Sequence, residues 1–200
     1  MATLVIVESP AKAKKIAGYL GQGYIVRASL GHVRDLPASK GEIPERYRQE
    51  PWAPLGVHPQ TFTPIYVVPA AKRQPVRELQ QLALKADAVL FASDMDREGE
   101  AISYHLSRLL KVDQPVRLVF TEITREALQE ALRNTRPLDL RLVAAQEARR
   151  VIDRLVGYRV SPLLWTSVGG KLSAGRVQSA ALMLLASREM ARMKFRAATF

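Results

Sequence analysis

Short apolar runs alternate with helix-forming stretches over roughly the first 120 of the 200 residues. The runs are rich in Val, Ile, Tyr and Phe, which favours β-strands. The expected strands are residues 4–7, 24–29, 65–68, 88–92 and 116–120. The expected helices are residues 11–20, 75–85, 98–110 and 125–133, the first of them begun by Ser9 and Pro10. This alternation predicts an α/β fold with a mainly parallel sheet covered by helices on both faces.

The pattern changes after residue 137, where no further strand is expected. Residues 138–156 and 177–191 are long helical stretches separated by the sequence SPLLW. We therefore predict an α/β domain over residues 1–123, a linker near 134–137, and the beginning of a helical, basic domain over 137–200. A polar, Pro-rich excursion, residues 31–64, interrupts the first domain. Its length is typical of functional or mobile loops.

Positive charge is concentrated in the second half of the chain. The formal net charge is +11, and from residue 141 onward there are 11 Lys and Arg against Glu147, Asp153 and Glu189. A focused basic region favours a polyphosphate partner such as nucleic acid, although membranes and acidic proteins also attract such surfaces. We expect no membrane span and no signal peptide. With no cysteine, disulfides and thiolate metal sites are excluded, which favours a cytoplasmic protein.

An acidic cluster stands out against this basic background. The stretch ASDMDREGEAISYH contains Asp94, Asp96, Glu98 and Glu100, and Glu8 follows the first expected strand. In an open parallel sheet, ligands bind beyond the carboxyl ends of the strands, so we expect Glu8 and the cluster at one edge. Acids near a helix start can also simply cap it. Capping explains one or two of these residues; a divalent cation such as Mg²⁺ explains the whole set better.

Five motifs carry a resemblance to a known family. They are VIVESPAKAKKI, GHVRDLP, DMDREGEAI, ARRVIDRLVGY followed by SPLLW, and LSAGRVQS. The first and third resemble the Toprim domain shared by topoisomerases, primases and some nucleases. The whole set, in this order, resembles the N-terminal part of bacterial type IA DNA topoisomerases. The resemblance implies a Rossmann-like Toprim domain over residues 1–123 and the truncated start of the family's helical catalytic domain over 137–200.

The resemblance also implies roles for residues of the first domain. Asp94 and Asp96 would hold Mg²⁺, with Glu98 supporting them and Glu8 belonging to the same acidic set. Glu8 would be the acid/base group that protonates the departing 3′ oxygen. Lys12 would neutralise a phosphate near the cut, and His32 would contact DNA beside it. Alone, each of these last two residues is a weak indication.

A single-strand DNA groove is the implied role of the second region. Its matching positions are Arg149, Arg150, Asp153, Tyr158, Trp165 and the segment Ser173, Ala174, Gly175, Arg176, Val177 and Gln178, with Arg176 as the cation of that segment. From spacing alone, Arg149 and Asp153 share a helix face and could form a surface pair. Aromatic faces can stack on bases, but Trp165 after two leucines is also typical of a core residue.

The nucleophile of the family is not found in this sequence. Type IA enzymes use a tyrosine in a Tyr-x-Arg-Thr-Asp-Ser motif, and none of the six tyrosines here is followed by x-Arg-Thr. We therefore predict a monomeric topoisomerase fragment that binds the single-stranded part of negatively supercoiled DNA and does not relax it alone. A standalone Toprim nuclease, which would use metal-activated water, and a non-catalytic DNA-binding module are the alternatives.

Overall fold

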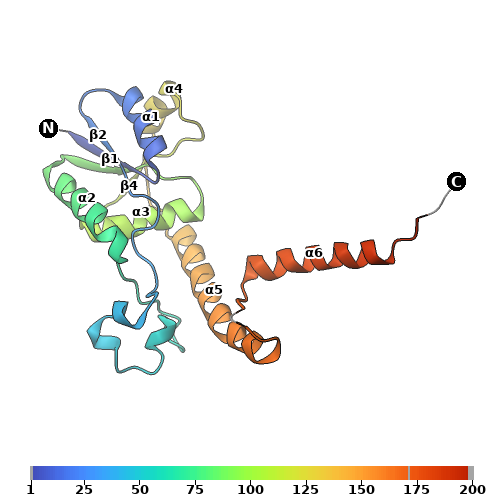
Figure 1. Ribbon diagram of the computed structural model, residues 1–200. Coiled ribbons are helices and arrows are strands. Elements are labelled where there is room, and N and C mark those ends of the chain that lie inside the picture. Colours follow the sequence, from blue (N-terminus) through green and yellow to red (C-terminus); the bar gives the residue numbers. More distant parts are fainter. Residues whose placement is uncertain (1, 171, 198–200) are drawn as a thin grey trace. The chain divides into compact units, whose positions relative to one another are not determined.

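A computed structural model describes residues 2–170 and 172–197 of the chain (Figure 1). Its centre is a five-stranded sheet in the order β2-β1-β3-β4-β5. The strands are β1 (Thr3–Val7), β2 (Tyr24–Ala28), β3 (Ala88–Phe91), β4 (Val116–Arg117) and β5 (Arg136–Pro137). The first four are mutually parallel and β5 is antiparallel to β4. The predicted α/β fold with a mainly parallel sheet is confirmed.

The described residues form six α-helices. They are α1 (Pro10–Leu20), α2 (Arg73–Lys85), α3 (Arg97–Leu110), α4 (Arg125–Arg133), α5 (Leu140–Ser167) and α6 (Arg176–Lys194). Helix α1 begins as expected: Ser9 caps it by accepting a hydrogen bond from the Lys12 amide, and Pro10 occupies its first turn. Proline suits that position because the first amides of a helix lack intrahelical acceptors.

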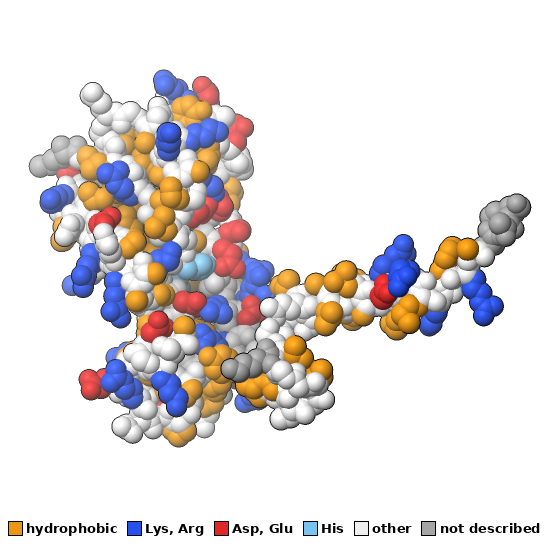
Figure 2. All heavy atoms as spheres, in the orientation of Figure 1, with side chains coloured by type: hydrophobic (Ala, Val, Ile, Leu, Met, Phe, Trp, Pro, Cys, Tyr) orange, Lys and Arg blue, Asp and Glu red, His pale blue; other side chains and the backbone are white. Residues whose placement is uncertain are grey.

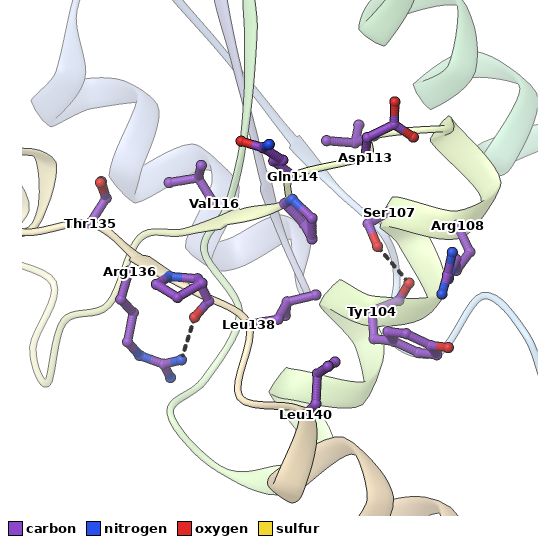
Figure 3. Close-up of a pocket in the computed structure, with 13 residues that line it drawn as sticks. Tyr104, Ser107, Arg108, Asp113, Gln114, Val116, Thr135, Arg136, Leu138 and Leu140 are labelled. Atoms are coloured by element: carbon purple, nitrogen blue, oxygen red, sulfur yellow. Dashed lines mark hydrogen bonds between the residues drawn. The ribbon is translucent and has the colours of Figure 1, made fainter.

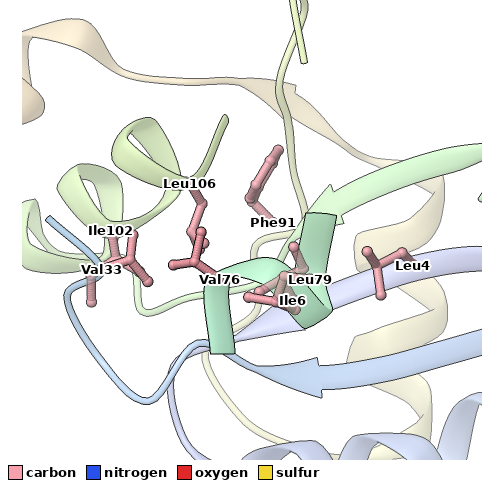
Figure 4. Close-up of a cluster of buried hydrophobic side chains, with 8 residues drawn as sticks. All are labelled: Leu4, Ile6, Val33, Val76, Leu79, Phe91, Ile102 and Leu106. Atoms are coloured by element: carbon pink, nitrogen blue, oxygen red, sulfur yellow. The ribbon is translucent and has the colours of Figure 1, made fainter. Parts of the chain in front are cut away.

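Each face of the sheet has its own apolar core, because successive β1 side chains point to opposite sides. On one side Leu4 and Ile6 pack with Phe91 and with residues of α2 and α3 (Figure 4). On the other side Val5 and Val7 pack with buried residues of α1 and α4, among them Ile16, Leu128 and Ala131. Helices therefore cover both faces, as the strand–helix alternation predicted.

Two predictions about strands were wrong. Residues 65–68 form no named strand; within the segment only Val67 forms an isolated bridge, with Asp35, and a second bridge joins Val57 to Pro64 just before the segment. Pro64 and Pro69 flank the segment, and proline has no amide hydrogen for a ladder. The expected linker instead contains β5, where Pro137 lies on an edge strand, the position in which a sheet tolerates proline. The 31–64 excursion folds through the short 3₁₀ helices η1 (Lys40–Glu42), η2 (Glu45–Tyr47) and η3 (Ala53–Leu55), and a fourth, η4 (Ala70–Lys72), precedes α2.

The helical region also differs from the prediction at one point. SPLLW is not a break between helices but the last part of α5, with Pro162 inside the helix. An internal proline removes one intrahelical hydrogen bond, and here the helix continues for a further turn. Residue contacts divide the chain into two compact units, Met1–Ala148 and Arg149–Phe200. The functional boundary expected between residues 123 and 137 stays a prediction. No helix of the described residues is both long enough and apolar enough to cross a membrane.

Candidate active site and nucleic-acid interface

Glu8, Asp94 and Lys12 come together where β1 and β3 end. Strands β1 and β3 are neighbours, so the residues that follow them emerge at the same edge. The Asp94 amide donates to Glu8 Oε2 over 3.0 Å. The Lys12 ammonium, from the first turn of α1, donates to both Glu8 Oε1 and Asp94 Oδ1. Two carboxylates from segments far apart in sequence are thus joined through one cation.

The electrostatics of this group favour its charged form. Partial burial alone lowers the pKa of Lys12, but its hydrogen bonds to Asp94 and Glu8 outweigh that effect and hold the pKa above its ordinary value. Partial burial likewise acts to raise the pKa of Asp94, and the hydrogen bonds from Lys12 and with Glu8 hold it below the ordinary value. Lys12 therefore stays cationic and Asp94 anionic at neutral pH.

The other two acids expected at the metal are engaged separately. The Asp96 carboxylate caps α3 by accepting from the Gly99 amide over 2.8 Å, which is the capping role that the sequence left open for one or two of these acids. Glu98 Oε2 lies 3.1 Å from His32 Nε2 and 3.2 Å from Gln146 Nε2. The structure therefore groups His32 with Glu98, and Glu8 with Asp94.

Gly99 allows the first turn of α3 to approach the loop of residues 92–96, which carries Asp94 and is called the acid loop below. A Cβ added to it would overlap the carbonyl oxygen of Asp94, so the glycine is required by space. The Gly99 carbonyl in turn accepts from the Ser93 hydroxyl over 2.6 Å. Asp94 is thus held by close backbone packing against α3.

Sequence reasoning missed a buried ion pair behind the acid loop. The Arg117 guanidinium, fully buried on β4, donates to Glu100 Oε1 over 3.0 Å and to the carbonyl oxygens of Ser93 and Asp94 over 2.8 Å each. Glu100 also pairs with Arg136. Burial lowers the pKa of Arg117 and the Glu100 carboxylate opposes this, so the guanidinium stays charged. Arg117 therefore positions the segment that carries Asp94.

Helix α3 also buries an imidazole. His105 is 2% exposed, and its ring lies edge-on to Tyr66 at 4.4 Å between centroids. Burial lowers the pKa of His105 to about 3, with the positive charge of Arg34 acting in the same direction. This histidine is neutral at physiological pH, which suits its place among aromatic rings.

A separate cavity of about 590 Å³ lies beside the second half of α3 (Figure 3). Its walls include Tyr104, Arg108, Arg136, Leu138 and Leu140. None of the four acids expected at the metal lines it. The cavity is therefore distinct from the edge where Glu8 and Asp94 meet.

The geometry of Glu8 and Asp94 fits a divalent cation. Both carboxylates reach one ammonium group, so a single small cation can contact both, and the Asp94 side chain is 59% exposed. Over residues 2–170 and 172–197, no three His, Cys, Asp or Glu side chains form a ready metal cage. Two carboxylates are nevertheless what Mg²⁺ commonly takes from a protein, with water and phosphate oxygens completing its shell.

Within the second unit, Arg176 and Asp153 form a two-pronged ion pair. Arg176 Nε and Nη2 donate to the two carboxylate oxygens of Asp153 over 2.9 and 3.0 Å. The hydrogen bond from Arg176 holds the pKa of Asp153 below its ordinary value, and Arg149 and Arg150 add to the effect. The structure thus brings together four positions that the family resemblance assigned to DNA.

Two aromatic residues of this unit, Tyr158 and Trp165, are a little under half exposed. Tyr158 is 44% exposed, and its hydroxyl accepts from Arg154 over 2.9 Å. Trp165 is 47% exposed and donates to the Leu172 carbonyl, so it is not a core residue here. Figure 2 shows Lys and Arg side chains interspersed with hydrophobic ones along α6.

The segment before α6 is held by short-range hydrogen bonds. The Ser173 hydroxyl donates to Gln178 Oε1 over 3.2 Å, and the Ala174 amide donates to the Ser161 hydroxyl over 3.0 Å. Gly175 is the N-cap of α6 and makes no side-chain cap, and Val177 is 66% exposed. Unblocked amides at a helix start are a suitable surface for a phosphate.

A mainly parallel sheet whose adjacent strands end in a carboxylate pair beside a lysine defines an α/β domain with an acidic site at its strand ends. The chain belongs to the Toprim family, whose domain model matches residues 3–123. A second model, described as DNA topoisomerase, matches residues 137–200.

Curated and solved relatives agree with these two matches. The chain is 54% identical to DNA topoisomerase 1 of Synechocystis over all of its own length and 22% of that protein. It is 53% identical to DNA topoisomerase 1 of Mycolicibacterium smegmatis over 98% of its length and 21% of that protein. The structure of full-length topoisomerase I from Thermotoga maritima matches 96% of this chain and 31% of that one, with 44% identity and a TM-score of 0.80. The chain thus spans about a fifth of the length of these curated relatives.

Proposed function

We propose that this chain is the part of a bacterial type IA DNA topoisomerase that binds the scissile phosphate and its metal. The whole enzyme would cut one DNA strand, pass the other through and reseal the cut, relaxing negative supercoils. The observation that carries the proposal is the meeting of Glu8, Asp94 and Lys12 at adjacent strand ends, in a chain that matches both family models along its length.

The groups at the sheet edge where β1 and β3 end would stabilise negative charge on the phosphate and supply the proton needed at the cut. Bound Mg²⁺, held by Asp94 and Glu8 with Asp96 and Glu98 nearby, would offset negative charge on the phosphate. Glu8 would act as the acid/base group that protonates the departing 3′ oxygen, a step for which the carboxyl must lie within hydrogen-bond reach. Lys12, which already bonds Glu8, would supply a positive charge to the phosphate. Arg117 donates to the backbone carbonyl of Asp94 and would keep the segment that carries Asp94 in a fixed position.

The second unit would bind the single-stranded segment. Arg149, Arg150 and Arg176 would contact phosphates, and the exposed faces of Tyr158 and Trp165 would stack on bases. Asp153 would orient the Arg176 guanidinium through their two hydrogen bonds. We further propose His32 as a DNA contact beside the cut, a monomeric protein, and a place in the bacterial cytoplasm with no membrane partner.

A chimera tests the proposal directly. This chain would replace the matching fifth of the Synechocystis topoisomerase, with which it shares 54% identity. We expect the chimera to relax negatively supercoiled plasmid in Mg²⁺. Glu8→Gln, and Asp94→Asn with Asp96→Asn, should each abolish relaxation, whereas Lys14→Met, an exposed lysine of the same helix as Lys12, should not.

Two outcomes would contradict the proposal. A folded chimera whose relaxation survives the loss of Glu8 would remove the acid/base assignment. Mg²⁺-dependent nicking by the 200-residue chain alone, unaffected by Lys12→Met but lost with Asp94→Asn, would favour the nuclease alternative, in which water replaces the tyrosine.

A further inference from the structure

Lys12 lies in the place that a bridging cation would take. Its ammonium donates to one oxygen of Glu8 and one of Asp94, while the other Glu8 oxygen accepts from the Asp94 amide. Three of the four carboxylate oxygens of the pair therefore already accept a hydrogen bond, and two of these bonds come from the lysine. A metal that binds both carboxylates and this ammonium compete for the same oxygen atoms.

The lysine is anchored so that its head group can leave while its backbone stays. The Lys12 amide is fixed by the Ser9 side chain at the start of α1, and the side chain itself is 27% exposed. A lysine ammonium is a point charge on a flexible four-carbon stem, which can swing without moving the helix. Under the proposed function, the phosphate of a bound DNA strand would offer it an alternative partner.

We propose that Lys12 is the resident counter-ion of the Glu8–Asp94 pair, that Mg²⁺ displaces it, and that the scissile phosphate draws it away. This inference rests on the proposed function and deepens it by giving Lys12 a second role. Lys12 shields the two carboxylates from each other before DNA arrives and then transfers its charge to the phosphate. The metal and the DNA consequently bind cooperatively.

If Lys12 moves between the carboxylates and the phosphate, the affinity for metal and the affinity for DNA depend on each other, and this dependence can be measured. If only the fraction of molecules with Lys12 swung out binds metal, the apparent metal affinity is reduced by that fraction. DNA raises the fraction, so DNA strengthens metal binding and metal strengthens DNA binding by the same factor. Without the lysine side chain the metal site is always open, and most of this coupling disappears.

Mn²⁺ binding to the 200-residue chain, followed by the electron paramagnetic resonance signal of free Mn²⁺, is the test. Lys12→Met and Lys12→Gln should each bind Mn²⁺ about three- to tenfold more tightly than the unchanged chain. Lys14→Met is the matched control, because it removes the same charge from an exposed position of α1 and should stay near the unchanged value. Circular dichroism confirms that each variant is folded.

The second arm adds a saturating single-stranded oligonucleotide. We expect it to tighten Mn²⁺ binding severalfold in the unchanged chain and in Lys14→Met, and to have little effect in Lys12→Met. Weaker or equal Mn²⁺ binding in both Lys12 variants, or equal tightening by DNA with and without the lysine, would overturn the inference and leave the proposed function standing. Unchanged Mn²⁺ binding in Asp94→Asn would instead remove the proposed metal site, and the inference would fall with it.

Discussion

His105 shows how one buried residue sets a pH response for the domain. Its pKa is lowered to about 3 by burial, whereas the unfolded chain takes up a proton near pH 6.5. Below pH 6.5 the unfolded state therefore binds more protons than the folded state, and stability falls as the pH falls. We expect His105 to contribute a slope approaching about 1.4 kcal/mol per pH unit between pH 6 and 5.

His105→Phe is the variant that isolates this effect. Phenylalanine keeps a ring next to Tyr66 and Tyr104 but cannot titrate. Urea unfolding at several pH values should give a shallower pH dependence for the variant by about one proton. Parallel curves for the two proteins would mean that His105 is protonated in the fold.

At the residue scale, the sequence predicted the acids better than their partners. Glu8 and Asp94 were predictable because Glu8 directly follows β1 and Asp94 lies three residues beyond the end of β3, and adjacent parallel strands end at one edge. Arg117 was not predictable as their support, because its partners Glu100, Ser93 and Asp94 meet it only after β4 pairs with β3. An arginine inside a short apolar strand is the one local signal that could have indicated a buried ion pair.

At the element scale, the junction between the acid loop and α3 depends on one glycine. Gly99 has no room for a Cβ, because the Asp94 backbone lies against it. We expect Gly99→Ala to lower the free energy of unfolding by about 1–3 kcal/mol and to weaken Mn²⁺ binding as the loop shifts. Thermal and urea unfolding, with a Mn²⁺ titration, would measure both effects.

Gly18→Ala is the matched control for that substitution. Gly18 lies within α1, and nothing is within 4 Å of a Cβ placed there. Alanine should raise stability by about 0.5–1 kcal/mol, because glycine is a poor helix former. Equal effects of the two substitutions would show that the contact between Gly99 and Asp94 is unimportant.

Elements with strong local patterns were predicted well, and those fixed by partners were not. Residues 125–133 match α4 because a Thr124 cap and an apolar face define that helix locally. Strand β5 has only two residues, and its pairing with β4 is what makes it a strand. The sequence predicts a helix that ends at residue 156, before SPLLW, yet α5 continues through SPLLW to Ser167.

At the scale of the whole molecule, the excess positive charge predicts salt-dependent binding of single-stranded DNA. Each phosphate neutralised by a Lys or Arg releases condensed cations, so affinity should fall steeply with salt. Arg149→Ala and Arg176→Ala should each reduce the slope of log affinity against log salt by roughly 0.7. Arg77→Ala, which removes an exposed charge from α2, should leave the slope unchanged. Fluorescence anisotropy with a labelled oligonucleotide at five salt concentrations measures the slope, and equal affinity for duplex DNA would contradict a single-strand groove.

The tyrosines of this chain lead to a negative prediction about strand passage. Relaxation requires a covalent bond that holds one broken end, and its nucleophile must reach the phosphate beside Glu8 and Asp94. Tyr104 is the tyrosine closest in sequence to the acid loop, but it lies on α3 in the wall of the separate cavity (Figure 3), where its ring contacts Arg108. Tyr66 has a buried hydroxyl, and the Tyr158 hydroxyl accepts from Arg154.

We therefore expect the 200-residue chain alone neither to relax negatively supercoiled plasmid nor to form a denaturant-resistant adduct with end-labelled DNA. The chimera with the remaining part of the Synechocystis enzyme should do both, because that part would supply the family's nucleophilic tyrosine. Gel electrophoresis of relaxation products and of labelled protein after denaturation measures the two activities side by side. A labelled band at the mass of the short chain, lost when one of its own six tyrosines is changed to phenylalanine, would show that the chain carries a nucleophile outside the family motif.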